Sequence, residues 1–318
     1  MFILERVFAV LLAAILSCAA VGAGQWPRRN VEAVVTASAG GDTDFNVRTI
    51  GKYFRDVAGV PLVVTNMPGG GGSVATSNVK NARNDGSKAL FCHTGQLIVN
   101  HVAGLIDYNY KDFEVSCIAG MNSSYIFVAG RQSGLASLAD LVEKAKKAPG
   151  KYVYGTEFGG FTHMQGLRLS RIAGIDLKTV DVGSSSEKVT SLLAGRIDFG
   201  AVAFGAVQDY IKNGDMIVLA QGSGERNALL GDFPTMKEQG VDMVMEFPYV
   251  LSFPKGTSRE IVEKMASYVG TITKNPAYAK DIEEGYKQRA FFAGPEDAVA
   301  YLDAVYADFR QYGDMLKK

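Results

Sequence analysis

Between residues 31 and 96, short apolar runs typical of buried strands alternate with segments whose apolar residues recur at helical spacing. The run Val31–Thr36 predicts a buried strand. From Phe45 to Val57 the apolar spacing predicts a helix, and Gly59 is expected to end that helix as a C-cap. The alternation continues through PLVVTNM (strand), SVATSNVKNAR (helix) and KALFCHTGQ (strand). This order of elements predicts the α/β class.

The same alternation continues beyond residue 120, and the whole chain predicts two α/β units. The expected strands are YIFVAG, KYVYGTEFGG, RIDFGAVAF, MIVLAQG and EFPYVLSFP. The expected helices are SLADLVEKAKKAPG, THMQGLRLSRIAG, SSSEKVTSLLAG, AVQDYIKNG, SREIVEKMASYVGTITKN and PEDAVAYLDAVYADFRQYGDML. Because no low-complexity linker separates the two units, we expect a chain that crosses between two lobes more than once.

The first residues have the pattern of an export signal. Arg6 precedes the apolar run VFAVLLAAILSCAAVGAG, which ends in small residues and lacks a charged stop-transfer flank. We expect cleavage near Ala23 and a mature protein in the periplasm. The alternative is a lipoprotein signal that uses Cys18.

Composition narrows the classes of partner. The 318 residues carry 33 basic and 33 acidic side chains, and no basic run stands out. This balance argues against nucleic acid or an anionic membrane surface as the main partner. Cys92 and Cys117 lie in the apolar stretches ALFCHT and VSCIAG, which have the pattern of buried strands, and in an exported protein either a disulfide or two buried thiols fits them.

The sequence lacks the common catalytic and phosphate-binding motifs. It contains no G-x-S-x-G, G-x-x-x-x-G-K-[ST] or H-E-x-x-H motif, and PGGGGS fails G-x-G-x-x-G because Val74 stands at the last glycine position. His93, His101 and His163 show no metal-ligand spacing. A catalytic triad assembled from distant residues stays open. We expect no enzyme activity, no cofactor and no bound metal.

The stretch SAGGDTD places two glycines and short polar side chains where a strand passes into a helix. Backbone N–H groups at a helix N-terminus and the hydroxyls of Ser38 and Thr43 are suited to grip a carboxylate. The structural alternative is that Asp42 or Asp44 only caps the helix.

Three further loops have the same donor-rich character. The glycines of NMPGGGGS allow a ligand to approach closely or merely form a flexible turn. In TEFGGFTHMQG, Thr162 and His163 open a helix, where Thr162 as an N-cap is the competing interpretation. Ser184 and Glu187 have the spacing of a capping box, and ligand contact by Ser184 is an additional hypothesis. Four such loops together favour a binder of a small anion.

The order of several motifs resembles a known family. GGDTD, VTNMPGGGG, NDGSKALF, GGFTHMQG, LLAGRIDF and FPTMKEQGVD follow one another as in the periplasmic solute receptors of tripartite tricarboxylate transporters, the Bug-type receptors. The resemblance covers essentially the whole mature chain. It implies a type II-like periplasmic binding protein of two lobes, each a mixed sheet flanked by helices. Residues 25–124 plus 248–318 would form lobe one, and 125–247 lobe two.

The resemblance also implies a mechanism. Such a receptor, expected here as a monomer, closes on a small carboxylate and delivers it to membrane transporter subunits. Main-chain amides, hydroxyls and bridging waters anchor the ligand. The alternatives are a receptor that feeds a signalling kinase, or an exported hydrolase. We expect lobe one to hold one carboxylate through its N–H groups and hydroxyls, and lobe two to close over it.

The ligand-binding residues implied by the resemblance come from loops of both lobes. They are Ser38, Gly41, Thr43, Asp44, Gly69, Gly70, Gly71, Thr94, Gly95, Thr162, His163, Gly183, Ser184 and Asp198. Beyond the resemblance, we expect Phe158 or Phe204 to complete the cage around the ligand. Two departures leave the ligand's identity open. Thr36 and Ala37 replace the usual Pro-Phe, and Asp181, Val182 and Gly183 replace the usual Pro, Tyr and Lys.

Overall fold

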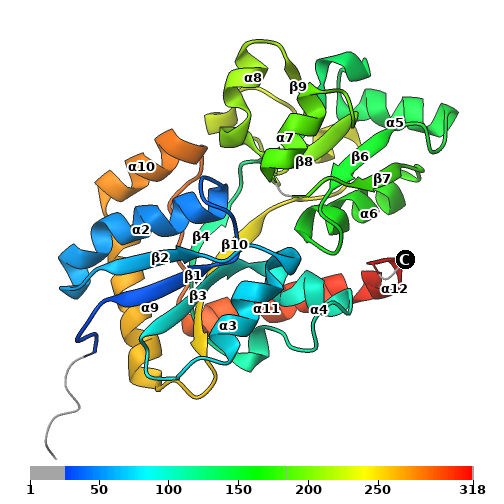
Figure 1. Ribbon diagram of the computed structural model, residues 1–318. Coiled ribbons are helices and arrows are strands. Elements are labelled where there is room, and N and C mark those ends of the chain that lie inside the picture. Colours follow the sequence, from blue (N-terminus) through cyan, green and yellow to red (C-terminus); the bar gives the residue numbers. More distant parts are fainter. Residues whose placement is uncertain (1–25, 184, 317–318) are drawn as a thin grey trace, which may run out of the picture.

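The computed structural model describes residues 26–183 and 185–316. Its strands form two sheets with the orders β2-β1-β3-β10-β4 and β7-β6-β8-β5-β9, and Figure 1 shows each sheet among its own helices. The α/β fold and the two lobes with mixed sheets are thereby confirmed. The expected signal peptide and Cys18 lie outside the described residues. Within the described part of the chain, no helix has the length and apolarity needed to cross a membrane.

In the first sheet, β1 pairs in parallel with β2 and β3, whereas β10 is antiparallel to β3 and β4. Its strands are β1 Val31–Val35, β2 Leu62–Asn66, β3 Lys88–His93, β4 Phe113–Asn122 and β10 Phe247–Pro254. The helices of this lobe are α2 Asp42–Ala58, α3 Ser73–Lys80, α4 Asn100–Val102, α9 Arg259–Thr273, α10 Pro276–Tyr286, α11 Pro295–Phe309 and α12 Gly313–Leu316.

The second sheet repeats this arrangement. β6 is parallel to β7 and β8, and β5 is antiparallel to β8 and β9. Its strands are β5 Tyr125–Gly130, β6 Val153–Thr156, β7 Lys178–Asp181, β8 Phe199–Ala203 and β9 Met216–Gln221. Its helices are α5 Leu138–Lys147, α6 Phe161–Ala173, α7 Ser185–Leu193 and α8 Gln208–Lys212. Each sheet therefore offers the carboxyl ends of three parallel strands.

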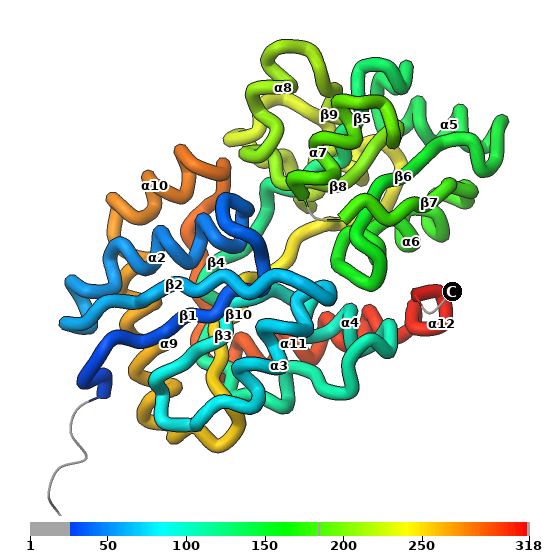
Figure 2. The backbone as a smooth tube through the Cα atoms, in the orientation of Figure 1, coloured from blue at the N-terminus to red at the C-terminus, as the bar shows by residue number. Residues whose placement is uncertain are grey.

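The chain passes between the sheets twice, from β4 to β5 and from β9 to β10 (Figure 2). The division predicted from the sequence falls at these passages, except that Phe247 already belongs to β10. We keep the predicted bounds as our proposed division into lobes. The C-terminal helices of lobe one also reach lobe two, because Arg171 of α6 lies over the ring of Tyr312 at 5.3 Å.

The predicted strands and helices are present in the structure, but the strand β7 and the helices α4 and α10 were not predicted. The sequence pattern predicts no helix between Asn275 and Pro295. In the structure Pro276 starts α10, and the side chain of Asn275 caps it by accepting from Ala277 N at 2.9 Å. The single helix expected over residues 295–316 is interrupted by a 3₁₀ turn at Arg310–Tyr312.

Buried apolar residues fill both lobes, and the two cysteines belong to this interior. Cys92 and Cys117 are both buried and both free, so of the two alternatives the structure contains separate thiols. Burial raises the pKa of Cys117 to about 12. Both thiols are therefore protonated and inert at neutral pH.

Candidate functional site

The candidate site is a cleft between the lobes, with a volume of about 340 Å³. It lies where the loops after β1, β2 and β3 face the loops after β6 and β7. Lobe one contributes Thr36, Ala37, Ser38, Asp42, Thr43, Pro68, Gly69, Gly71, Gly72, His93 and Gln96. Lobe two contributes Tyr125, Glu157, Gly160, Phe161, Thr162, Gly183, Ser185, Glu187 and Lys188. This position matches the rule that ligands of open α/β sheets bind outside the carboxyl ends of the strands.

The structure brings only some of the predicted site residues to the cleft. Those that line it are Ser38, Thr43, Gly69, Gly71, Thr162 and Gly183. Those that lie outside its lining are Gly41, Asp44, Gly70, Thr94, Gly95, Phe158, His163, Asp198 and Phe204. Ser184 lies outside the described residues, so its expected capping box with Glu187 does too. Ligand contact by any of these residues stays a prediction.

Several residues outside the lining have structural partners instead. Asp198 accepts a hydrogen bond from Val153 N at 2.7 Å and so joins β8 to β6. His163 Nδ1 accepts from Gly159 N at 3.1 Å, and the exposed ring of Phe158 stacks on the imidazole of His163. Phe204 packs within the apolar core of lobe two. The Asp198 contact lies at the amino ends of β6 and β8, the ends opposite the cleft.

At the start of α2, two acidic side chains occupy the N-terminal turn. The N-cap is Gly41, without a side-chain cap, so neither Asp42 nor Asp44 is the N-cap considered above. Asp44 Oδ2 accepts from Gly40 N at 2.9 Å, and the Asp44 carboxylate is paired with Arg48. Burial opposes ionisation of Asp44, but hydrogen bonds from Arg48, Gly40 and Asn66 outweigh it and keep its pKa below the ordinary value.

Asp42 is buried at the same helix end and faces the cleft. Its Oδ2 accepts from the Tyr249 hydroxyl at 2.7 Å and from Asn122 Nδ2 at 3.0 Å. Burial raises the pKa of Asp42 in spite of these donors. The sequence placed this residue only as a possible cap.

The start of α6 has the same backbone but different charges. Its N-cap is Gly160, which corrects the alternative that Thr162 caps the helix, and no acidic residue lies in the first turn. Thr162 Oγ1 lies 2.7 Å from Thr156 Oγ1 and accepts from Lys188 Nζ at 3.1 Å. The hydroxyl of Thr162 therefore helps to fix a cation at this helix end.

Lys188 was not predicted from the sequence, although it is buried and lines the cleft. Its ammonium donates to Thr162 Oγ1 and, at 3.2 Å, to the carbonyl oxygen of Ala201. Burial lowers the pKa of Lys188 to about 8, although the nearby Glu157 and Asp42 charges oppose the shift. One signal was available: Lys188 precedes the buried Leu192 by four residues, which places it on the inner face of α7.

Glu157 is a second residue that was not predicted. It is partly buried at the end of β6, and burial raises the pKa of its carboxyl group. Within residues 26–183 and 185–316, no donor lies within hydrogen-bonding distance of this carboxylate, and no cation lies within ion-pair distance. The Glu157 carboxylate can therefore accept hydrogen bonds from a ligand.

The lining rings of Phe161 and His93 pack on Phe247, which lies outside the lining, and one lining hydroxyl lacks a partner among the described residues. The ring of Phe247 lies 4.6 Å from that of Phe161 and 4.6 Å from that of His93. Burial lowers the pKa of His93 to about 3, so its imidazole is neutral. The buried hydroxyl of Thr36 lacks a hydrogen-bond partner among the described residues. The cleft thus combines hydroxyls, glycine N–H groups, a buried ammonium and several carboxylates.

Comparison with known proteins decides the family. A family model described as the tripartite tricarboxylate transporter family receptor matches residues 47–289. The chain belongs to this receptor family. A curated relative from Agrobacterium vitis, the UPF0065 protein in the TAR-I ttuE-ttuC' intergenic region, is 29% identical over 277 residues, which is 86% of this chain and 80% of the relative.

Solved structures support the same fold for this receptor. The structure of R. palustris Rpa4515 with adipate has a TM-score of 0.83 at 22% identity and covers 92% of this chain and 98% of that one. MatC from Rhodopseudomonas palustris with bound malate has a TM-score of 0.78 at 21% identity, and the match covers 91% of this chain and 100% of MatC. These similarities confirm the two-lobed fold.

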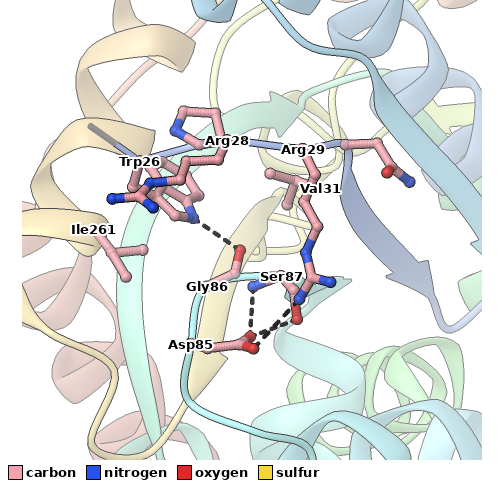
Figure 3. Close-up of a pocket in the computed structure, with 10 residues that line it drawn as sticks. Trp26, Arg28, Arg29, Val31, Asp85, Gly86, Ser87 and Ile261 are labelled. Atoms are coloured by element: carbon pink, nitrogen blue, oxygen red, sulfur yellow. Dashed lines mark hydrogen bonds and ion pairs between the residues drawn. The ribbon is translucent and has the colours of Figure 1, made fainter. Parts of the chain in front are cut away.

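A larger cavity of the receptor, about 480 Å³, lies away from the cleft and is shown in Figure 3. Trp26 Nε1 donates to the carbonyl oxygen of Gly86 at 3.2 Å, and Arg29 pairs with Asp85 at 3.5 Å. This cavity adjoins the amino end of β1, opposite the end at which ligands of such sheets bind. We therefore take the cleft as the candidate ligand site.

Proposed function

We propose that this receptor binds a small carboxylate in the cleft between its lobes. The observation that carries the proposal is the buried ammonium of Lys188, held at the N-terminus of α6 and facing the cleft. An ammonium buried without an anion is costly, and a ligand carboxylate would relieve that cost. The hydroxyls of Ser38 and Thr43 and the N–H groups around Gly69 and Gly71 would supply further donors.

Closure would follow from contact with both walls. A ligand that touches the lobe-one loops and Lys188 together gains its full set of hydrogen bonds only when the lobes are closed. Hydrogen bonds to a charged group contribute about 1.5–3 kcal/mol each. Three or four of them would support micromolar affinity, about −8 kcal/mol, after the cost of association.

The proposed physiological role is delivery without chemical turnover. We propose that the receptor acts as a periplasmic monomer whose closed form is recognised by the membrane subunits of a tripartite tricarboxylate-type transporter. Copurification with those subunits should increase when the ligand is present. Copurification that is independent of ligand would contradict recognition of the closed form.

A thermal-shift screen of the purified protein tests the carboxylate proposal. The panel contains mono-, di- and tricarboxylates, aliphatic and aromatic, each beside its amide or ester. A ligand present at 100 times its dissociation constant adds about 2.7 kcal/mol, which shifts the melting temperature by several degrees. Stabilisation by an acid but not by its amide supports the proposal. Stabilisation by the neutral analogues alone would overturn it.

A further inference from the structure

The charges lining the cleft do not suit a purely anionic ligand. Among the described lining residues, Lys188 is the single cation, because His93 is neutral. Three acidic residues, Asp42, Glu157 and Glu187, line the same space. A dicarboxylate would bring two more negative charges to this cleft, and like charges at such distances in a low-dielectric site repel strongly.

The acidic residues differ in how well they are already paired. Asp42 accepts from Tyr249 and Asn122. Glu187 also has an interaction within the protein. Glu157 lacks both a hydrogen-bond donor and an ion-pair partner among the described residues, although it is partly buried. A partly buried carboxylate gains most from a ligand that supplies N–H donors.

Lys188, in contrast, can still donate a hydrogen bond to a ligand. An ammonium has three N–H groups, and two of them are used on Thr162 Oγ1 and the Ala201 carbonyl. Within the described chain no third acceptor lies within hydrogen-bonding distance of Lys188 Nζ. Lys188 and Glu157 influence each other's pKa but do not form an ion pair. Both groups line one cavity, so the two ends of a short dipolar molecule can be accommodated there.

A separate observation also indicates a polar ligand in this space. The Thr36 hydroxyl is 6% exposed, lines the cleft and has no hydrogen-bond partner among the described residues. Buried hydroxyls are normally satisfied by protein, water or ligand. This hydroxyl lies on the lobe-one wall of the cleft.

We propose that the ligand is a zwitterion of the amino-acid type, whose ammonium binds Glu157 and whose carboxylate binds Lys188. This inference rests on the proposed function, because it assumes that the cleft binds a carboxylate. It adds that Glu157 selects ligands that carry an ammonium group.

The test is isothermal titration calorimetry at pH 7 with matched pairs of ligands. Each of the nineteen standard amino acids with a primary α-amino group is compared with the acid that lacks only that group, for example L-phenylalanine with 3-phenylpropanoate and L-aspartate with succinate. We expect at least one amino acid to bind 10-fold or more tightly than its partner acid. In Glu157→Gln that ratio should fall at least 10-fold, whereas the exposed control Glu225→Gln should preserve it.

Glu157→Asp keeps the charge on a shorter side chain and should retain part of the preference if Glu157→Gln proves unstable. Equal or tighter binding of the des-amino acids would overturn the inference and leave the proposed function standing. A preference that survives Glu157→Gln would also overturn the inference. So would binding of amide-bearing acids such as succinamate that equals the binding of the amino acids, or the absence of binding in all nineteen pairs. The carboxylate screen decides the proposed function independently, since it includes acids without nitrogen.

Discussion

The two strand–helix junctions that face each other across the cleft share a backbone but differ in charge. Each helix follows a glycine pair, and the N-caps Gly41 and Gly160 have nearly the same conformation, with φ/ψ of −80°/171° and −87°/179°. The first turn of α2 contains Asp42 and Asp44, whereas the first turn of α6 contains no acidic residue.

This difference changes what each helix end can do for a ligand. The Asp44 carboxylate, whose pKa is lowered, already lies at the positive end of the α2 dipole. At α6 the dipole is reinforced by Lys188, which contacts Thr162 in the first turn. A glycine pair before a helix is therefore insufficient to locate an anion site. The charges around the first turn decide, and they favour lobe two over the expected lobe one as the holder of the carboxylate.

Lys188→Met should have the largest effect on ligand affinity, because it removes the cation at the N-terminus of α6. Loss of a charged hydrogen bond of about 2.7 kcal/mol corresponds to about 100-fold weaker binding of the tightest acid in the screen. Calorimetry with Lys147→Met, an exposed lysine on α5, is the matched control. Equal affinities of the Lys188 and Lys147 variants would exclude Lys188 as an anchor.

The same variant should alter how stability depends on pH. The pKa of Lys188 is about 8 in the folded protein and 10.5 ordinarily, so between these values the unfolded chain binds more protons. The free energy of unfolding of the wild type should therefore rise relative to Lys188→Met as pH increases from 8 to 10.5. Urea unfolding at several pH values measures this difference. A difference that is constant with pH would contradict burial of a charged Lys188.

Thr43→Val tests the α2 side with a smaller expected effect. The Thr43 side chain lines the cleft, and valine keeps its shape but removes the hydroxyl. We expect about 10-fold weaker ligand binding, the value for one hydrogen bond of about 1.4 kcal/mol, with little change in melting temperature. Thr49→Val is the control, because Thr49 Oγ1 donates to Phe45 O in the same helix. Unchanged affinity in Thr43→Val would remove Thr43 from the proposed site.

The fold could be predicted from the sequence because each buried strand is a short apolar run and most helices carry clear periodicity. The strand Val31–Val35 and the C-cap Gly59 illustrate this. The helix α10 was missed because a proline marks both the end of one helix and the first position of another. Only the side-chain cap from Asn275 distinguishes the two cases.

The site could be predicted only in part. Short polar residues at strand ends, such as Ser38 and Thr43, are visible in the sequence because loops at strand ends have a recognisable composition. Lys188 and Glu157 were missed because their role depends on which helix face and which loop the tertiary fold turns inward. Asp198 illustrates the opposite case, since this predicted site residue bonds to Val153 N at the amino ends of β8 and β6, away from the cleft.

The smallest expected effect concerns the glycine pairs themselves. A Cβ added at Gly41 would lie 3.6 Å from Ser38 O, an ordinary contact, whereas one added at Gly160 would lie 3.2 Å from Glu157 O. Both glycines have φ values that alanine adopts freely, so crowding alone should separate the two variants. We expect Gly41→Ala to be near neutral and Gly160→Ala to lower the free energy of unfolding by about 1 kcal/mol. Because the added Cβ should displace Glu157, Gly160→Ala should also reduce the preference for amino acids over the matched acids. If the variant loses stability but keeps that preference, the packing at this junction does not position Glu157 for ligand selection.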